Sequence, residues 1–431
     1  MVSKQIARVL DVVAVPHHAG ITWIEPRRGG ITRVVQREKQ FPGIKFSASQ
    51  KINEKRLQSF SFLEDCIRMT DLRVVMLKKI FAFLLFAAIV STNNSVVAQT
   101  DLSSKQQVTI HGKDFYKDGK LWLPKGIKIE GFNEPAGLRA KSKIATEARS
   151  YWGTSELDAI RRVFNADVIR FAVSQPGLDP QSPIYDQQYV IELLDAIKLA
   201  RSAGFVVIPS MDAQGENGIP NLPCMPNDST KRSWQILAPS LIHDQGVMFE
   251  LSDEPCKSSN AENQKEWSQE MQSLVDAVRG LGSTNILLLD GLWYARSTNG
   301  LFPLVHDTLP NRLALAVHPY LVSKDFFVTE KQWHDQFGAS AEKFPVIASE
   351  WNATSTNGCI GDTTPTVALS LMRYLESLHL GLIGWAIDSH SGKLVKDHIS
   401  YEPTDYSSFA GCTKTPSESG GGRLLASYPN D

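Results

Sequence analysis

The sequence is poor in cysteine, in long hydrophobic runs and in net charge. Five of its 431 residues are cysteine, and no CxxC pair or cysteine–histidine spacing of a zinc site occurs. One uninterrupted apolar run, Ile80–Val90, is eleven residues long, whereas a membrane-spanning helix needs about 20. The formal net charge is −1, and no low-complexity region stands out. These features argue against a zinc-binding domain and a spanning helix.

Charge is distributed unevenly along the chain. Residues 1–75 carry 13 lysines and arginines against 7 acidic residues, whereas residues 99–431 carry 30 against 39. The larger part is therefore mildly acidic. Such a balance is unfavourable for a nucleic-acid-binding protein, and no nucleic-acid partner is expected.

The short apolar run has the pattern of a secretory signal peptide. Lys78 and Lys79 precede it, polar residues follow it, and a small residue, Ala98, stands at the end of the segment. We therefore predict a signal peptide over residues 76–98 and a secreted, extracellular or periplasmic protein without membrane association after cleavage. A buried helix or a membrane anchor is the alternative interpretation.

A signal peptide must begin a chain, so residues 1–75 are interpreted as a mis-called leader, with Met76 as the true start. They show no clear strand or helix period and are expected to be poorly ordered. Cys66 falls in this leader, so four cysteines remain in the predicted mature region, 99–431. Four cysteines allow three pairings in an exported protein; a reduced set is the alternative.

Strand and helix patterns alternate through the mature region. After a predicted hairpin over Val108–Trp122, turning at 117–119, short apolar segments bounded by turn residues alternate with helical periods. The predicted strands are Ile127–Glu130, Asp167–Val173, Gly204–Pro209, Val247–Leu251, Asn285–Gly291, Arg312–Tyr320, Pro345–Ser349 and Gly381–Asp388. The predicted helices are Thr154–Phe164 (capped by Thr154 or Ser155), Gln187–Ser202, Ser229–Ile242, Asn263–Leu281, Gln332–Phe337 and Val367–Leu378.

Eight such strands predict an α/β fold, a single (β/α)8 TIM barrel over about residues 105–430 with a short N-terminal hairpin. A doubly wound open sheet is the alternative, but Glu130–Pro135 lacks the glycine-rich phosphate turn usual after its first strand. Loops after neighbouring strands lie close together at one face of a barrel. We therefore expect the disulfides Cys224–Cys256 and Cys359–Cys412.

The carboxyl ends of barrel strands converge on one mouth. Here they carry acids, one cation and aromatic faces, an inventory suited to binding sugar rings. Two of the ends each deliver a glutamate, which suggests a two-carboxylate hydrolase. The residues concerned are Arg170, Asp212, Asp253, Glu254, Trp293, His318, Tyr320, Glu350 and Trp385.

Four short motifs resemble those of glycoside hydrolase family 5, the cellulase-type family of the clan A barrels. They are Asp-Glu-Pro at 253–255, His-Pro-Tyr at 318–320, Ser-Glu-Trp at 349–351 and Gly-Trp-Ala at 384–386, and together they span most of the predicted barrel. The resemblance implies that Glu254 is the general acid/base and Glu350 the nucleophile of a retaining mechanism. It further implies that Tyr320 hydrogen-bonds the nucleophile.

The resemblance also assigns substrate-binding roles. His318 is expected to contact substrate or the acid/base, Trp385 to form the floor of the subsite that holds the attacked sugar, and Trp293 to line a flanking subsite. Asp253 stands where the family has a sugar-binding asparagine. On physical grounds, Arg170 is the cation that would keep Glu350 ionised.

Plainer interpretations exist for these residues. Glu254 and Glu350 can be solvated loop acids, Arg170 a structural ion pair, His318 a satisfied core histidine, and the tryptophans barrel core. Residues 133–135 match the family's usual Asn-Glu-Pro motif better than residues 253–255 do. It follows the first strand rather than the fourth, however, so we assign the acid/base to Glu254.

Two departures from the family pattern are present. Asp253 replaces the asparagine and, when ionised, can only accept hydrogen bonds. The histidine usual after the third strand is absent, and Met211, Asp212 and Ala213 stand there.

The sequence thus predicts a monomeric, metal- and cofactor-independent retaining glycosidase of endo-β-1,4-glucanase type, acting on a β-linked polysaccharide or oligosaccharide. The departures favour one rival, a catalytically weak barrel that binds carbohydrate. A metal-dependent barrel hydrolase using Asp212 and His318 is a second rival, opposed by the few histidines.

Overall fold

A computed structural model describes residues 106–139, 141, 143–213, 223–353, 358–389, 393–405 and 420–430, and the backbone of three strands near the N-terminus. The chain divides into two compact units, Met1–Val96 and Val97–Asp431. Across the described residues, no helix combines the length and the apolar character that crossing a membrane requires. The signal peptide predicted at 76–98 lies outside the described residues.

In the first unit, the described residues form a three-stranded antiparallel sheet. It consists of β1 (Val13–His17), β2 (Gly20–Glu25) and β3 (Arg33–Val35), paired in that order. The sequence pattern did not predict strands here, and the interpretation of residues 1–75 as a poorly ordered leader stays a prediction. Pro16 lies inside β1 and cannot donate to a ladder, which weakens the strand pattern. The rest of residues 1–75 lies outside the described part.

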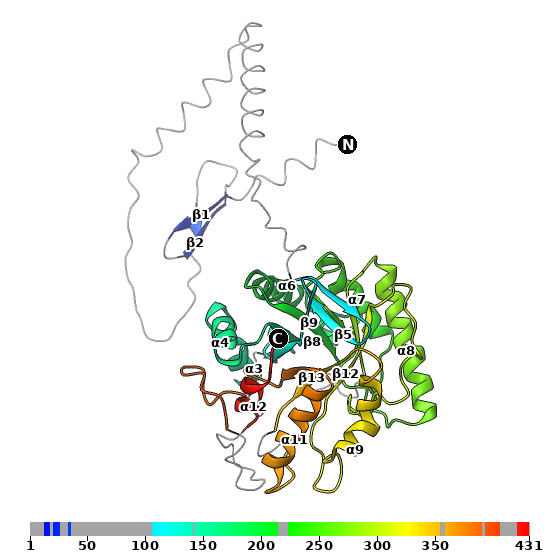
Figure 1. The fold of residues 1–431 in the computed structure, drawn as a ribbon. Helices are drawn as coiled ribbons and strands as arrows, with labels where there is room; N and C mark the ends of the chain where they lie inside the picture. The colour runs from blue at the N-terminus through cyan, green and yellow to red at the C-terminus, as the bar shows by residue number, and fades with distance from the viewer. Residues whose placement is uncertain are drawn as a thin grey trace. The chain divides into compact units, whose positions relative to one another are not determined.

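The second unit is a closed barrel of eight parallel strands that follow one another in chain order (Figure 1). The predicted (β/α)8 fold is therefore confirmed. The strands are β7 (Lys125–Ile129), β8 (Val168–Ser174), β9 (Val206–Asp212), β10 (Phe249–Glu250), β11 (Leu287–Asp290), β12 (Leu313–Val317), β13 (Val346–Trp351) and β14 (Gly381–Gly384).

Helices surround the barrel (Figure 1), and each long predicted helix is present within a few residues of its expected bounds. The helix α4 begins after Gly153, which makes no side-chain cap, so the expected cap by Thr154 or Ser155 is wrong. The main helices are α4 (Thr154–Phe164), α6 (Gln187–Ser202), α7 (Asp228–Leu237), α8 (Ala261–Gly280), α9 (Glu330–Trp333), the π-helix η7 (His334–Gly338) and α11 (Thr364–Ser377). Short additional helices are α2 (Ala136–Arg139), α3 (Lys143–Tyr151), α5 (Gln175–Leu178), η6 (Ala238–Ser240), α10 (Ala339–Ala341) and α12 (Gly422–Ser427).

A small antiparallel sheet closes the amino end of the barrel. It contains β4 (Val108–His111), β5 (Asp114–Lys117) and β6 (Lys120–Leu121), so the segment has one turn more than the predicted hairpin. Its apolar residues, together with Trp122, join the hydrophobic cluster inside the barrel. The indole of Trp122 donates to Asp167 before β8 (2.8 Å), which ties the small sheet to the barrel.

The barrel interior has an apolar floor and a charged upper layer. Side chains alternate along a strand, so on β8 Val168 and Arg170 both face inward. Val168 belongs to the apolar interior cluster, whereas the buried Arg170 contacts acids from other strands. The same alternation applies to Glu250 of β10 and to Met248, which directly precedes β10 and belongs to the apolar interior cluster. Because the charged layer lies toward the carboxyl ends, the apolar floor supports the functional end of the barrel.

One predicted disulfide is present. Cys224 and Cys256 are bonded, with their Cα atoms 5.1 Å apart, and thus join the loops after β9 and β10. Cys359 also takes part in a disulfide. Its predicted partner, Cys412, lies outside the described residues, so that pairing stays a prediction.

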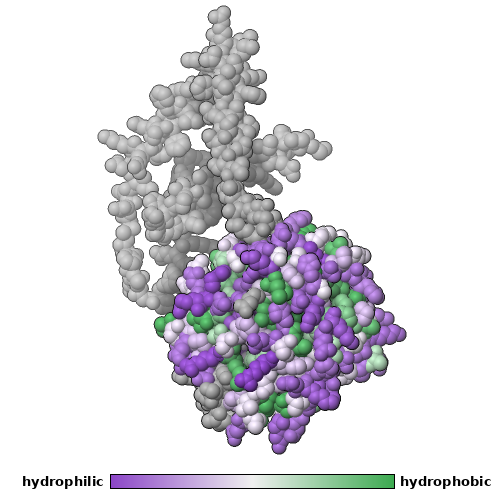
Figure 2. Space-filling model, viewed as in Figure 1, coloured by the Kyte–Doolittle hydropathy of each residue, from purple (hydrophilic) through white to green (hydrophobic). Residues whose placement is uncertain are grey.

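The surface of this unit is predominantly polar on the face shown in Figure 2, where apolar residues form small separate areas. Among the described residues, the large apolar side chains that are exposed are spread along the chain; they are Leu121, Ile191, Tyr294, Leu304, Val322, Phe326 and Ile399.

Gly291 offers a test of packing at the carboxyl end of β11. A Cβ there would lie 2.4 Å from the backbone oxygen of Ser297, which accepts from the N–H of Leu292 (2.9 Å). We expect Gly291→Ala to lower the unfolding free energy by about 1–3 kcal/mol, measured by chemical denaturation. Gly280→Ala, where a Cβ meets nothing within 4 Å, is the matched control and should cost nothing. Equal stability of the two variants would contradict the packing described.

Candidate active site

The two glutamates predicted to act together lie together at the carboxyl end of the barrel. Glu350 belongs to β13, and Glu254 follows β10 by four residues. One side-chain ligand atom from each of Glu254, His318 and Glu350 lies within 4.8 Å of the others. The side chains from three separate strand ends thus form one compact group.

Three hydrogen-bond donors hold the carboxylate of Glu350. Arg170 Nη1 and Lys128 Nζ each lie 2.6 Å from Oε2, and the hydroxyl of Tyr320 donates to Oε1 at 2.9 Å. Burial by itself would raise the pKa of Glu350. The charges of Lys128, His318 and Arg170 outweigh burial and hold this pKa well below its ordinary range. Glu350 is therefore ionised at neutral pH.

An irregularity in β13 gives Glu350 its direction. The register with β14 shifts between Ala348 and Trp351. Consecutive residues of a regular strand face opposite sides, yet the hydroxyl of Ser349 contacts His318 at 3.1 Å and Glu350 contacts Arg170. A bulge of this kind can re-aim a side chain, and here it lets both neighbours reach the charged interior layer.

Glu254 has the opposite electrostatic environment. Its Oε1 lies 2.9 Å from Nδ1 of His318. Burial raises the pKa of Glu254, the negative charges of Glu350 and Asp253 add to this, and contact with His318 opposes it; the net shift is upward. Its backbone is left-handed, with φ +48°, and its N–H donates to Asp290 Oδ2 at 2.9 Å.

Arg170 is the cation that connects the site. Besides Glu350, its guanidinium donates to Glu250 Oε2 (2.5 Å), Asp253 Oδ1 (2.5 Å) and the hydroxyl of Ser210 (3.0 Å). The side chain is fully buried, and the negative charges around it hold its pKa well above the ordinary value against the effect of burial. Asp253 accepts from Arg170, so it offers substrate an acceptor and no donor.

His318 is fully buried behind Glu254. Burial would lower its pKa, but the charge of Glu350, the nearby carboxylate of Glu250 (Oε1 3.9 Å from Nε2) and the contact with Glu254 raise it well above the ordinary value. Tyr320, on the same loop, is buried as well, and burial together with Glu350 raises the pKa of its hydroxyl. That hydroxyl therefore stays protonated and acts as a donor to Glu350.

The predicted aromatic residues lie at two places. Trp385 is half-buried, packs edge-on against Tyr320 with ring centroids 6.3 Å apart, and donates from its indole to Glu130 Oε1 at 2.5 Å. The peptide bond that follows it is cis. Trp293 begins a turn of three consecutive left-handed residues, and its ring lies 5.5 Å from that of Phe326.

Two further acids lie apart from this group: Asp212, predicted at the mouth, and Glu134, from the alternative Asn-Glu-Pro motif. Asp212, at the end of β9, accepts from the side chain of Asn133 at 3.0 Å. Glu134 is buried in the loop after β7. Among the described residues, neither acid belongs to the close groups of acids and histidines around Glu254 and Glu350.

Four charged residues of the site were not predicted: Lys128, Glu130, Glu250 and Asp290. Lys128 contacts Glu130 (3.1 Å) as well as Glu350. Each of the four occurs in or directly after an apolar strand, where a buried charge requires a partner. That was a usable signal. Glu250 is the one polar residue in its predicted strand, Val247–Leu251.

Two groups of side chains converge closely enough to hold a cation. They are Glu250, Asp253, Asp290 and His318, and separately Glu254, His318 and Glu350. Positive charge is already supplied to both. Arg170 contacts Glu250, Asp253 and Glu350, and Lys128 contacts Glu350. Protein cations therefore already compensate these carboxylates, which makes the donor set a poor fit to a divalent metal.

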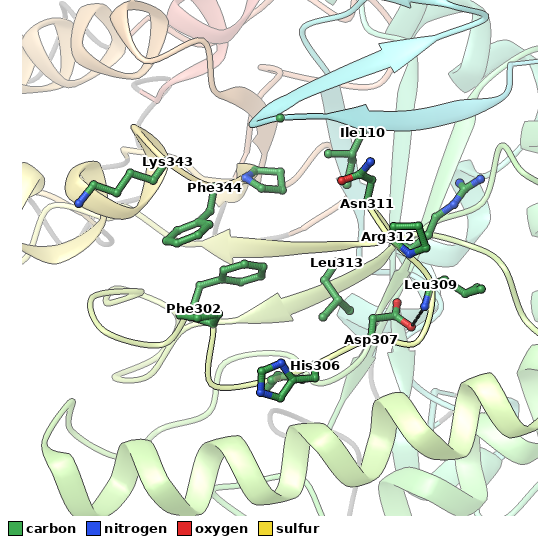
Figure 3. Close-up of a pocket in the computed structure, with 15 residues that line it drawn as sticks. Ile110, Phe302, His306, Asp307, Leu309, Asn311, Arg312, Leu313, Lys343 and Phe344 are labelled. Atoms are coloured by element: carbon green, nitrogen blue, oxygen red, sulfur yellow. Dashed lines mark hydrogen bonds between the residues drawn. The ribbon is translucent and has the colours of Figure 1, made fainter.

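Figure 3 shows a separate pocket of about 340 Å³, which is lined by none of the site residues described above. It is lined by residues at the amino ends of β12 and β13, including Arg312, Leu313 and Phe344, and by Ile110 of the small sheet. The rings of Phe302 and Phe344 pack with centroids 4.3 Å apart. Because barrel strands are parallel, this end is opposite to the end that carries Glu254 and Glu350.

Solved structures with the same fold include three carbohydrate-active enzymes. A β-glucanase of Saccharophagus degradans in complex with cellotetraose is 18% identical, with a TM-score of 0.53 over 70% of this chain and 91% of its own. The catalytic domain of an endoglucanase of Thermobifida fusca is 16% identical, with a TM-score of 0.50 over 74% and 96%. The catalytic domain of a mannanase of a Streptomyces species is 16% identical, with a TM-score of 0.50 over 73% and 94%.

Comparison with curated proteins gave no match. The family model for cellulase, glycosyl hydrolase family 5, matches residues 127–391. This segment runs from the first barrel strand past the last and contains every predicted catalytic and sugar-binding residue. The chain therefore belongs to glycosyl hydrolase family 5.

Proposed function

We propose that this protein is a secreted retaining glycosidase that cleaves a β-linked polysaccharide or oligosaccharide, with Glu350 as nucleophile and Glu254 as general acid/base. The observation that carries the proposal is the pair of carboxyl groups with oxygens within 4.8 Å of each other and with pKa values shifted in opposite directions. Retaining enzymes place their two carboxyl groups about 5–5.5 Å apart, whereas inverting enzymes need about 6.5–9.5 Å to admit a water.

In the first step, the ionised Glu350 attacks the anomeric carbon. The bond from that carbon to the glycosidic oxygen breaks, and Glu254 gives its proton to the departing oxygen. Tyr320 and Lys128 hold the attacking carboxylate in one orientation, which reduces the entropy lost on reaching the transition state. The products are a shortened saccharide and a glycosyl ester of Glu350.

In the second step, water attacks the same carbon from the side that the leaving group occupied. Glu254, now ionised, takes a proton from this water, and the ester bond to Glu350 breaks. The sugar is released with its original configuration, and both glutamates return to their starting protonation states. The charge of the neighbouring His318 assists the ionised state of Glu254 at this stage.

The proposal also names a substrate class. The structures named above include glucanases and a mannanase, which supports a β-linked polymer of hexoses, and we assign an endo-β-1,4-glucanase-like activity. We assign Trp385 to the floor of the subsite for the attacked sugar, and Trp293 to a flanking subsite. Asp253, held by Arg170, would accept a hydrogen bond from a sugar hydroxyl.

Hydrolysis of defined glucan, mannan and xylan oligosaccharides, with product sizes determined, tests this function. We expect turnover that a chelator does not affect. Binding without turnover on every glycan would establish the carbohydrate-binding barrel instead. Loss of activity with chelator, restored by a divalent metal, would establish the metal-dependent hydrolase.

Substitution of the two glutamates should affect different substrates differently. Glu254→Gln cannot protonate a leaving group, so we expect kcat on an oligosaccharide to fall by about 10²–10⁴. On an aryl glycoside, whose phenolate leaves without being protonated, the rate of the glycosylation step in this variant should fall much less. Glu350→Gln removes the nucleophile and should abolish turnover of both substrates. Glu134→Gln is the control and should retain activity; full activity of the other two variants would refute the assignment.

Lys128 should set the acid limb of the pH profile. Glu350 must be ionised to attack, and Lys128 lowers its pKa. In Lys128→Met this pKa rises, so the acid limb of kcat/KM should move to higher pH by about 1–3 units, while the alkaline limb is set by Glu254. Lys231→Met, which removes a surface partner of Asp228, should leave the profile unchanged. An unmoved acid limb in Lys128→Met would contradict this account.

A further inference from the structure

Two buried carboxyl groups of the site have no role in the mechanism above. Glu250 ends β10 and Asp290 ends the neighbouring strand β11. Both are fully buried. Glu250 Oε2 accepts from Arg170 Nε at 2.5 Å, and Asp290 Oδ2 accepts from the N–H of Glu254 at 2.9 Å. Each group thus has one oxygen with a donor.

The second oxygen of each group lacks a donor. Within the described part of the chain, Glu250 Oε1 and Asp290 Oδ1 are buried atoms without a hydrogen-bond partner. An oxygen of Glu250 also lies within 4.8 Å of one of Asp290. Two ionised carboxylates this close repel each other, and each would leave a buried acceptor unsatisfied. A single proton between them resolves both problems.

Asp290 is the better place for that proton. Arg170 favours the ionised form of Glu250, and its charge and hydrogen bond hold the pKa of Glu250 below the ordinary value against burial. Burial raises the pKa of Asp290 well above its ordinary value, and the charge of Glu250 adds to this. Asp253 acts in the same direction and His318, 3.7 Å from Asp290 Oδ2, acts against it.

We propose that Asp290 is a protonated positioning residue whose O–H donates to Glu250 Oε1 while its other oxygen holds the N–H of Glu254. The proposal rests on the function proposed for Glu254. The left-handed backbone at Glu254 is uncommon for a residue other than glycine, and the bond to Asp290 fixes it. Asp290 thereby determines where the acid/base presents its carboxyl group.

The four side chains Glu250, Asp253, Asp290 and His318 would also be the ligands if a cation occupied this place. Arg170 already contacts two of them, and this favours a proton. Metal analysis of the purified full chain distinguishes the two occupants. A stoichiometric divalent cation that is lost in Asp290→Asn would overturn the proposal.

Infrared difference spectroscopy tests the proton directly and needs no substrate. The spectrum of the wild type minus that of Asp290→Asn, both recorded at pH 7, should show the C=O band of a protonated carboxylic acid. This band should shift in heavy water. Asp228→Asn, the control, removes a carboxyl that is 80% exposed. The spectrum of the wild type minus that of this variant should show only the bands of an ionised carboxylate. If Asp290→Asn gave that same ionised pattern, the proposal would be wrong.

Kinetics test the positioning role. Asparagine reproduces both hydrogen bonds, because its N–H₂ can donate to Glu250 and its oxygen can accept from Glu254. Leucine reproduces neither. On any substrate the wild type hydrolyses, Asp290→Leu should lower kcat at least tenfold with KM changed less than threefold, and Asp290→Asn should recover most of the loss.

Thermal denaturation of both variants accounts for any loss of folded protein. Equal kcat loss in the two variants would contradict positioning through hydrogen bonds. If the wild type hydrolysed no glycan, the proposed function would fail, and the infrared result would still decide the state of Asp290.

Discussion

The site depends on one buried guanidinium. Arg170 contacts Glu250, Asp253 and Glu350 within 2.5–2.6 Å, and removal of its charge would leave three carboxylates close together in the barrel. Two unit negative charges 4.8 Å apart repel by about 3 kcal/mol at an effective dielectric constant of about 20. The interior layer can hold so many acids only because Arg170, with Lys128 beside it, compensates them.

The distribution of positive charge separates the two glutamates chemically. Glu350 receives both cations and the hydroxyl of Tyr320, so its ionised form is favoured. Glu254 lies among other acids, and these together with burial raise its pKa against the opposing effect of His318. A retaining glycosidase requires this asymmetry between two like residues. In this barrel it arises from which strand each partner occupies: β7 and β8 supply the cations, and their side chains point toward β13.

Much of the fold could be predicted from the sequence, because eight apolar segments alternating with helical periods leave few topologies. Position in the strand order also distinguished Glu254 from Glu134, although the residues around Glu134 match the family's Asn-Glu-Pro motif more closely. The rest depended on three-dimensional contacts. The register shift in β13 lets Ser349 and Glu350 both face inward. It cannot be recognised in the alternation of apolar and polar residues along the sequence. Lys128 stands between two isoleucines, which marks it as a charge that needs a partner, but the sequence pattern does not show that this partner is Glu350, 222 residues away.

The stereochemistry of hydrolysis tests the central claim most directly. Proton NMR of the wild-type reaction on a β-linked oligosaccharide, recorded before mutarotation, identifies the anomer released first. Two successive displacements at Glu350 predict the β-anomer. Initial release of the α-anomer would mean that water attacks directly, and Glu350 could then not be the nucleophile.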